Sequence, residues 1–216
     1  MGLGQKLLAI KFDEIKDVKD YPKKIRLLDS NSWNHINENG QKVLRGFNVV
    51  CFKNINILQG YFENKYDIKN YEFVQVSNED IDYLINICDN FLQYFSENFI
   101  QEAKDYKELS SYEYAKKYEP NYLDDLNKND KDITDSINNL FFCKLNKKLR
   151  ITVNGNKECE QIINKILPVT GGLFHDNDKL TIHYLLKILG IKEIFKCAKK
   201  FLMNKNKEKI YYHCWY

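Results

Sequence analysis

The longest regular pattern in the chain begins at Ser77, and it constrains the fold more than any other feature. Apolar residues recur there every three or four positions, at Ile81, Leu84, Ile85, Cys88, Leu92 and Phe95. This spacing places them on one face of a helix, while Ser77 supplies a cap and Glu79 and Asp80 put negative charge in the first turn. The pattern predicts an amphipathic helix from Ser77 to about Phe99.

Four later segments also show helical spacing. They are Ser110 to the residue before Pro120, Lys157–Leu167, a segment starting near Asp176 or Asp178, and Ile191–Met203. The first of them has Glu113 three residues after Ser110, which is the pattern of a capping box. The helix that starts near Asp176 is expected to end at Gly190, a residue type favoured just past a helix.

Short runs rich in β-branched and aromatic residues predict five strands. They are Leu7–Phe12, Phe47–Phe52, Tyr71–Val76, Leu149–Val153 and Lys209–Tyr216. Because these runs do not alternate regularly with the helices, a doubly wound parallel sheet is not expected. The prediction is an α+β fold, rich in helix, with a small and mostly antiparallel sheet.

The chain is expected to form a single domain over residues 1–216, because no Pro-rich or Gly/Ser-rich linker divides it. Residues 120–135 hold many Asn and Asp side chains, which suit turns better than helix interiors. We expect a surface loop or insertion there. The six cysteines form no Cys-x-x-Cys pair and are expected to be reduced.

Charge is distributed unevenly along the chain, although the net charge is only +3. Residues 1–108 hold 14 basic and 17 acidic side chains, residues 109–138 hold 4 and 7, and residues 139–216 hold 15 and 6. The last third therefore has a net charge of +9. Such a basic segment favours an anionic partner, either nucleic acid or an acidic protein surface.

A group of lysines and aromatic residues near the end of the chain is the candidate binding site. It consists of Lys196, Lys199, Lys200, Lys205, Lys207, Lys209, Tyr211 and Trp215. Lysines can contact phosphates while aromatic rings stack on bases, so RNA is one candidate partner and an acidic protein is the other. The alternative interpretation is a solvated helix face whose lysines reflect codon bias.

The turn at residues 171–178 is a candidate anion site, formed by Gly171, Gly172 and His175 before a helix N-terminus. It does not match a phosphate-loop pattern, and Asp176 and Asp178 are better explained as a helix cap and a first-turn acid. Neither a metal, a cofactor nor a catalytic set of residues is predicted, because no His, Cys or carboxylate spacing supports one.

Several segments together resemble a group of small phage- and prophage-encoded proteins that open Met-Gly-Leu-Asp-Met-Tyr-Leu. The matching pieces are the opening Met1-Gly2-Leu3, Trp33-Asn34, the strand and capped helix at 71–81, the Leu-Pro and glycine segment at 167–174, and Tyr211-Tyr212-His213-Cys214-Trp215. Residues 4–6 and 175–177 depart from that pattern. The resemblance implies a mobile-element origin and a shared α+β fold, and it carries no catalytic residue.

These observations lead to an expected function. We expect a non-enzymatic phage or prophage accessory protein that binds a host protein or ribonucleoprotein complex, as an anti-CRISPR-like steric inhibitor of a bacterial defence complex. No apolar run approaches the length of a membrane span and the start does not match a signal peptide, so the expected location is the cytoplasm of the bacterial host. The alternatives are an enzyme acting on nucleotides or nucleic acid at the Gly171–Asp178 turn, and a structural or virion-assembly protein.

Overall fold

The computed structural model describes residues 4–12, 15–26, 40, 43–53, 56–68, 72–166, 180–204 and 208–215. The chain divides into two compact units. Unit 1 comprises the described residues within 1–88, 165–176 and 190–216, and unit 2 comprises those within 89–164 and 177–189. That residues 1–216 form a single domain stays a prediction, and the structure shows that the chain consists of two compact units.

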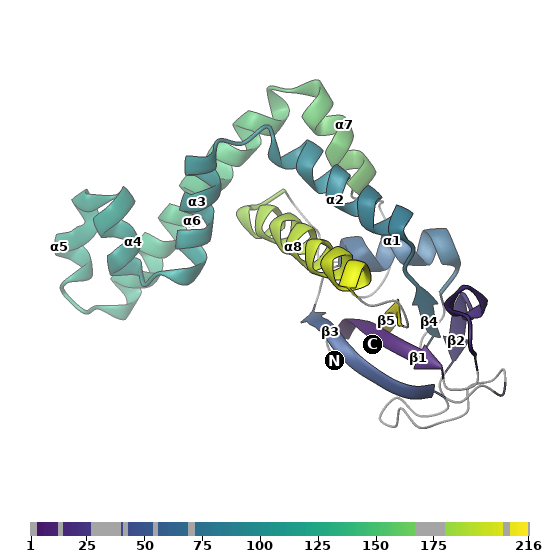
Figure 1. Ribbon diagram of the computed structural model, residues 1–216. Helices are drawn as coiled ribbons and strands as arrows, with labels where there is room; N and C mark the ends of the chain where they lie inside the picture. Colours follow the sequence, from purple (N-terminus) through teal and green to yellow (C-terminus); the bar gives the residue numbers. More distant parts are fainter. Residues whose placement is uncertain are drawn as a thin grey trace. The chain divides into compact units, whose positions relative to one another are not determined.

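Unit 1 contains a five-stranded sheet, counted over the described residues, with the strand order β2-β4-β5-β1-β3 (Figure 1). The strands are β1 (Gly4–Phe12), β2 (Lys24–Arg26), β3 (Val43–Lys53), β4 (Glu72–Gln75) and β5 (Lys209–Trp215). All four neighbouring pairs are antiparallel. The first and last strands of the chain are therefore neighbours near the middle of the sheet, with Leu8 opposite Tyr211.

One face of this sheet is covered by helices. Helix α1 (Asn56–Tyr66) places the ring of Phe62 against the ring of Tyr212, with the ring centroids 4.2 Å apart. Helix α8 (Ile182–Asn204) adds Phe195, whose ring centroid lies 6.4 Å from that of Phe62. The Tyr212 hydroxyl accepts a hydrogen bond of 2.7 Å from Gln5, so the buried polar groups here are paired.

The opposite face of the sheet is also buried. Leu8 and Phe12 of β1 pack with Tyr211 of β5, and Tyr21 closes the cluster after the short 3-10 helix η1 (Val18–Asp20). The Tyr211 hydroxyl donates a 2.7 Å hydrogen bond to the carbonyl of Pro22. Because both faces are covered, β1 and β5 consist largely of buried residues without a polar alternation.

Unit 2 is built from helices throughout its described residues (Figure 1). They are α3 (Glu97–Glu108), α4 (Ser111–Tyr118), η2 (Pro120–Tyr122), α5 (Leu123–Leu126), α6 (Lys131–Asn154) and α7 (Lys157–Ile166), with the ends of α2 (Asn78–Leu92) and α8. The predicted capping box of α4 is confirmed. Ser110 Oγ accepts from the Glu113 amide at 3.3 Å, and the Glu113 carboxylate accepts from the Ser110 amide at 3.0 Å.

The structure confirms the α+β class, with many helices and a small antiparallel sheet, but it corrects one strand. Leu149–Val153 is helical and lies within α6. In that helix Leu145, Leu149 and Val153 are buried at every fourth position, so packing in unit 2 overrides the β-branched preference of this run.

Two helix boundaries were also wrong. The predicted helix from Ser77 to Phe99 is two helices, since α2 ends at Leu92 and α3 begins at Glu97 behind the cap Ser96. Gly190 does not end a helix but lies inside α8. The predicted helix start near Asp176 or Asp178 lies outside the described residues.

Residues 120–135 do not form the predicted loop, whereas the alternative of an insertion stays a prediction. The segment contains η2, α5 and the start of α6, and its turn is limited to residues 127–130. Asp130 in that turn caps α6 by accepting from the amides of Asp132 and Ile133.

Candidate functional site

Helix α6 in unit 2 carries a buried apolar stripe and, on another face, a second stripe in which exposed apolar and polar residues are mixed. The first is buried in the core of unit 2 and consists of Ile137, Phe141, Leu145, Leu149 and Val153. The second contains Cys143, which is exposed, and Ile151, which is 63% exposed. The first stripe already anchors α6 in unit 2, so the second is not required for packing this helix.

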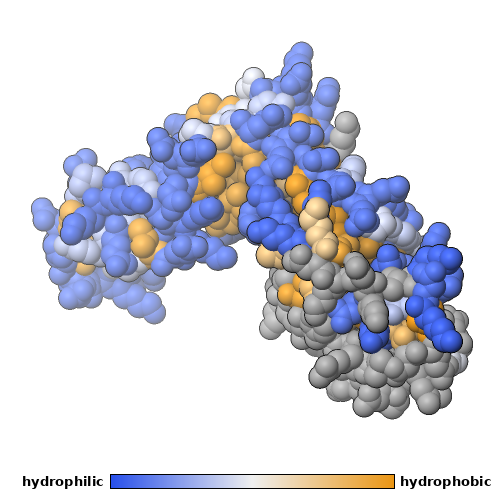
Figure 2. Space-filling model, viewed as in Figure 1, coloured by the Kyte–Doolittle hydropathy of each residue, from blue (hydrophilic) through white to orange (hydrophobic). Residues whose placement is uncertain are grey.

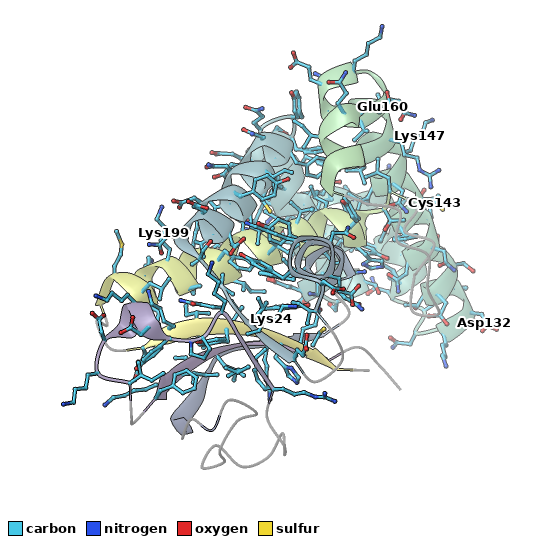
Figure 3. The ribbon with its side chains drawn as sticks, turned by 90° about the vertical axis from the view of Figure 1, so that its right-hand side faces the viewer. Lys24, Asp132, Cys143, Lys147, Glu160 and Lys199 are labelled. Atoms are coloured by element: carbon cyan, nitrogen blue, oxygen red, sulfur yellow. The ribbon has the colours of Figure 1, made fainter. Side chains whose placement is uncertain are left out.

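A groove of about 510 Å³ lies along the second stripe. Its lining residues are Phe142, Cys143, Asn146, Lys147, Arg150, Ile151 and Asn154. In Figure 2 the visible face of unit 2 is largely hydrophilic, with hydrophobic residues between the polar ones. In Figure 3 Cys143 and Lys147 lie on the same outward side of α6. Exposed apolar surface bordered by polar residues is typical of a binding surface.

The charges at this groove are positive. No Asp or Glu lines it, and neither Lys147 nor Arg150 has an ion pair within the part of the chain that the structure describes. Two other lysines of α6 are already neutralised. Lys144 Nζ lies 2.7 Å from a Glu119 carboxylate oxygen, and Lys148 Nζ lies 2.8 Å from a Glu102 carboxylate oxygen.

Two further lysines of unit 2, Lys107 and Lys187, lie close enough to His183 to act on its ring, which packs at one end of the groove. The His183 ring packs against the Phe142 ring with centroids 5.2 Å apart. Desolvation and the neighbouring charges of Lys187 and Lys107 lower the pKa of His183 below its ordinary value. The groove therefore offers apolar contact together with a positive electrostatic potential, which suits a ligand that is both apolar and anionic.

The lysines predicted from the sequence do not all form a free surface. Lys199 Nζ lies 2.6 Å from the Asp82 carboxylate, and Lys196 Nζ lies 3.4 Å from Glu193. Lys200 is exposed on α8 and has no ion pair among the described residues. Lys209 is half-buried in β5, whereas Lys205 and Lys207 lie outside the described residues.

The aromatic part of the predicted site was wrong for Tyr211. Its side chain is completely buried in the sheet of unit 1, so it is not available to stack on a base. Trp215 is the last residue of β5. The candidate anion site at Gly171, Gly172 and His175 lies outside the described residues.

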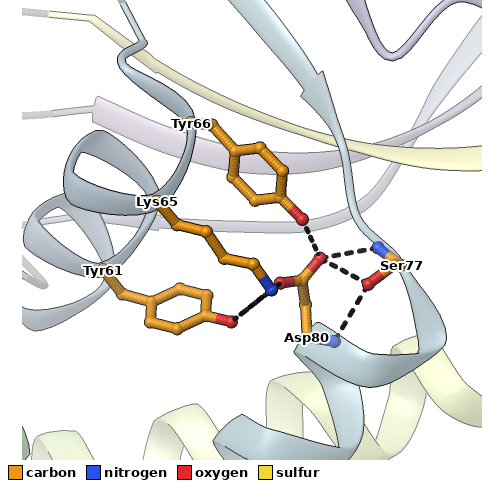
Figure 4. Close-up of polar contacts among 5 residues, drawn as sticks. All are labelled: Tyr61, Lys65, Tyr66, Ser77 and Asp80. Carbon is orange, nitrogen blue, oxygen red and sulfur yellow. Dashed lines mark hydrogen bonds and ion pairs between the residues drawn. The ribbon is translucent and has the colours of Figure 1, made fainter.

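A second polar cluster surrounds the buried carboxylate of Asp80 in unit 1 (Figure 4). Helix α1 supplies three donors to it, the Tyr61 hydroxyl at 2.7 Å, Lys65 Nζ at 2.6 Å and the Tyr66 hydroxyl at 2.6 Å. The amide and hydroxyl of Ser77 each donate a further bond of 2.8 Å. Asp80 thus joins the start of α2 to the last turns of α1.

The protonation equilibria of this cluster favour a structural role. Burial alone would raise the pKa of Asp80, but the hydrogen bonds from Lys65, Tyr66 and Ser77 outweigh it and lower that pKa below its ordinary value. Burial and the hydrogen bond to Asp80 raise the pKa of Tyr61. The carboxylate stays ionised and the phenol stays neutral at pH 7, whereas a general base needs a pKa near the working pH.

Two of the buried cysteines, Cys159 and Cys214, are poorly suited to nucleophilic chemistry. Burial raises the pKa of Cys159 to about 11 and, together with the charge of Glu63, that of Cys214 to about 12. The thiolate is the nucleophile in cysteine chemistry, so these thiols serve packing. The adjacent His213 donates from Nδ1 to the Glu72 carbonyl at 3.1 Å, because a carbonyl oxygen can only accept.

Comparisons with known proteins assign the chain to no family. No protein-family model, curated protein or solved structure matches the chain. Among the described residues, no group of three or more His, Cys, Asp or Glu side chains is placed to hold a metal ion. No helix in the same part of the chain is long and apolar enough to cross a membrane.

Sequence reasoning missed the groove residues Lys147, Arg150 and Ile151. They lie in the basic last third, so the charge count included Lys147 and Arg150 without distinguishing them from the paired lysines. The run Leu149–Val153 was interpreted as a strand, which hid the helical spacing of Cys143, Lys147 and Ile151. The helical spacing of the apolar residues between 137 and 153 is the signal that could have identified the groove residues.

Proposed function

We propose that the protein is a non-enzymatic accessory protein of a phage or prophage, and that it inhibits a bacterial defence nucleoprotein complex by steric occlusion. The observation that supports the proposal best is the α6 groove, where exposed apolar side chains lie beside two cations that have no acidic partner in the described chain. Such a surface suits an anionic host protein or ribonucleoprotein. Inhibition by occlusion needs a binding surface and no chemistry.

The polar clusters favour binding over catalysis. The Asp80 carboxylate is saturated by five donors, and the pKa shifts of Asp80, Tyr61 and Cys214 move these groups away from reactivity at neutral pH. The resemblance to phage and prophage proteins supports action in the cytoplasm of a bacterial host.

A plaque assay tests the proposal directly. The protein is expressed in bacteria that carry a defined CRISPR system targeting a phage, and the efficiency of plaquing is compared with that of cells carrying an empty vector. Inhibition is expected to restore plaquing, and the purified protein is expected to co-migrate with the effector complex on size-exclusion chromatography. If neither effect is seen with any defence system of the natural host, the proposed function is wrong.

The groove variant in this assay is Lys147→Glu with Arg150→Glu. A matched control is Lys116→Glu with Lys131→Glu, which changes the net charge equally at two exposed lysines of unit 2 that do not line the groove. Loss of inhibition in the groove variant alone would assign the activity to this surface.

A further inference from the structure

The α6 groove has the length and spacing of a site for a helix. Its outer lining residues Cys143, Lys147, Ile151 and Asn154 follow one another at three- and four-residue intervals along α6. At 1.5 Å per residue, this row extends about 17 Å, or about three helical turns. A partner helix that places apolar side chains at i, i+3 or i+4, and i+7 presents a matching row.

The two positive charges of the groove favour a partner helix that carries acidic residues. Lys147 lies within the row and Arg150 lines the groove beside it, and neither has an ion pair with a described residue. Lys144 and Lys148, in contrast, are paired with Glu119 and Glu102. A helix with Asp or Glu beside its apolar stripe supplies the two missing partners. A basic helix would bring like charges together, which costs affinity.

The apolar side chains of the groove favour protein over nucleic acid. Ile151 and Cys143, its exposed apolar residues, have no aromatic face on which a base can stack. The ring of Phe142 is half-buried and packs against the rings of Tyr106 and His183. A nucleic acid would therefore gain only phosphate contacts here, whereas leucine-like side chains fill an apolar groove.

We propose that the α6 groove binds an acidic amphipathic helix of the partner protein. This inference rests on the proposed function, since it assumes that the protein acts by binding, and it names the partner surface. Ile151 and Cys143 contact the apolar stripe of the helix, while Lys147 and Arg150 contact its acidic residues.

The test uses synthetic peptides and the full chain. The probe is a fluorescein-labelled peptide of about 18 residues, long enough for five turns, with Leu at helical spacing and Glu on both sides of the stripe. One control peptide has the same composition with the leucines scrambled, and a second has Lys in place of Glu. Fluorescence anisotropy measures binding to the wild type, Ile151→Glu, the Lys147→Glu/Arg150→Glu variant and the Lys116→Glu/Lys131→Glu control.

The expected result is saturable binding of the acidic amphipathic peptide with a Kd below about 100 µM. Binding is expected to weaken by about tenfold or more in both groove variants and to stay within about twofold of wild type in the control. Circular dichroism establishes that each variant is folded. As a second measurement, the bound peptide is expected to slow modification of the Cys143 thiol in unaltered protein.

Five outcomes overturn the inference, four in the binding assays and one in sedimentation. Those in the binding assays are equal binding of the scrambled peptide, equal binding by the groove variants, no binding of the acidic peptide, and tighter binding of single-stranded poly(U) RNA that is lost with Lys147 and Arg150. A groove occupied by a second copy would appear as a dimer in sedimentation that Ile151→Glu dissociates, and it too would overturn the inference.

The plaque assay separates this inference from the proposed function. If the wild type restores plaquing but the groove variants do so equally well, the function stands and the groove assignment is wrong. If the peptide binds as expected but no defence system is inhibited, the groove assignment stands and the proposed function is wrong.

Discussion

Lowering the pH from 7.5 to 5 is expected to destabilise unit 1 through the protonation of His213. This side chain lies in the middle of the sheet and is 1% exposed. Its ring stacks on that of Phe73 with centroids 4.0 Å apart, and Lys6 is its register partner on β1. Burial lowers the pKa of His213 from 6.5 to about 4, the positive charge of Lys6 adds to the shift, and the hydrogen bond to the Glu72 carbonyl opposes it.

The sign and size of the effect follow from this shift. As the pH falls, the imidazole binds a proton in the unfolded chain below about pH 6.5 but in the folded chain only near pH 4, so protons favour the unfolded state between these values. For these two pKa values, the free energy of unfolding falls by about 2 kcal/mol between pH 7.5 and 5, with a limit of about 3 kcal/mol at lower pH. Carboxylates contribute little above pH 5 because their ordinary pKa values lie near 4.

Urea denaturation followed by circular dichroism at several pH values between 5 and 7.5 measures this slope. The variant His213→Phe keeps an aromatic ring at the site but cannot titrate, so its free energy of unfolding is expected to be nearly independent of pH in this range. His183→Gln is the matched control, and because His213 stays buried in the sheet of this variant, most of the slope should persist. A wild-type stability that does not change over this range, or an unchanged slope in His213→Phe, would refute the reasoning.

Three further predictions concern stability and reactivity. Asp80→Asn should lower the free energy of unfolding by about 2–4 kcal/mol, because it leaves Lys65 and four other donors without their ionised acceptor. The control Asp125→Asn, at an exposed ion pair, should lower it by less than about 0.5 kcal/mol in the same urea titration. Gly190→Ala should raise the melting temperature and add about 0.5–1 kcal/mol, since a Cβ at this helical position would meet no atom within 4 Å; a loss of stability would show that α8 needs glycine there. The exposed Cys143 and Cys197 should react with a maleimide in the native protein, while the buried Cys88, Cys159 and Cys214 should react only in denaturant. Mass spectrometry of the digested protein identifies the labelled cysteines, and labelling of a buried cysteine in the native protein would contradict the prediction.

Short-range signals in the sequence predicted the features that depend on neighbouring residues. The capping box at Ser110 was predicted correctly, because its partners are three residues apart and their hydrogen bonds form within one turn. The strand at Leu7–Phe12 was likewise predicted, since a run of apolar residues suits a strand buried on both faces.

Long-range packing decided the features that were wrong or missed. Leu149–Val153 has strand-like composition, yet burial of Leu145, Leu149 and Val153 on one face made it helical. Three of the five donors that satisfy Asp80 come from α1, which is 14 to 19 residues away in sequence. The first-turn acid recognised at Asp80 therefore gave no sign of these three partners.

The sequence by itself determined the α+β class, the basic last third and the local helix caps, because these depend on composition and on residues within a few positions of one another. Only the tertiary structure decided which cations remain available to a partner. Lys144, Lys148 and Lys199 are neutralised by carboxylates 25, 46 and 117 residues away, while Lys147 and Arg150 have no acidic neighbour in the described chain. The physical reason is that ion pairing depends on distances of a few ångströms in space, which charge counts along the chain do not contain.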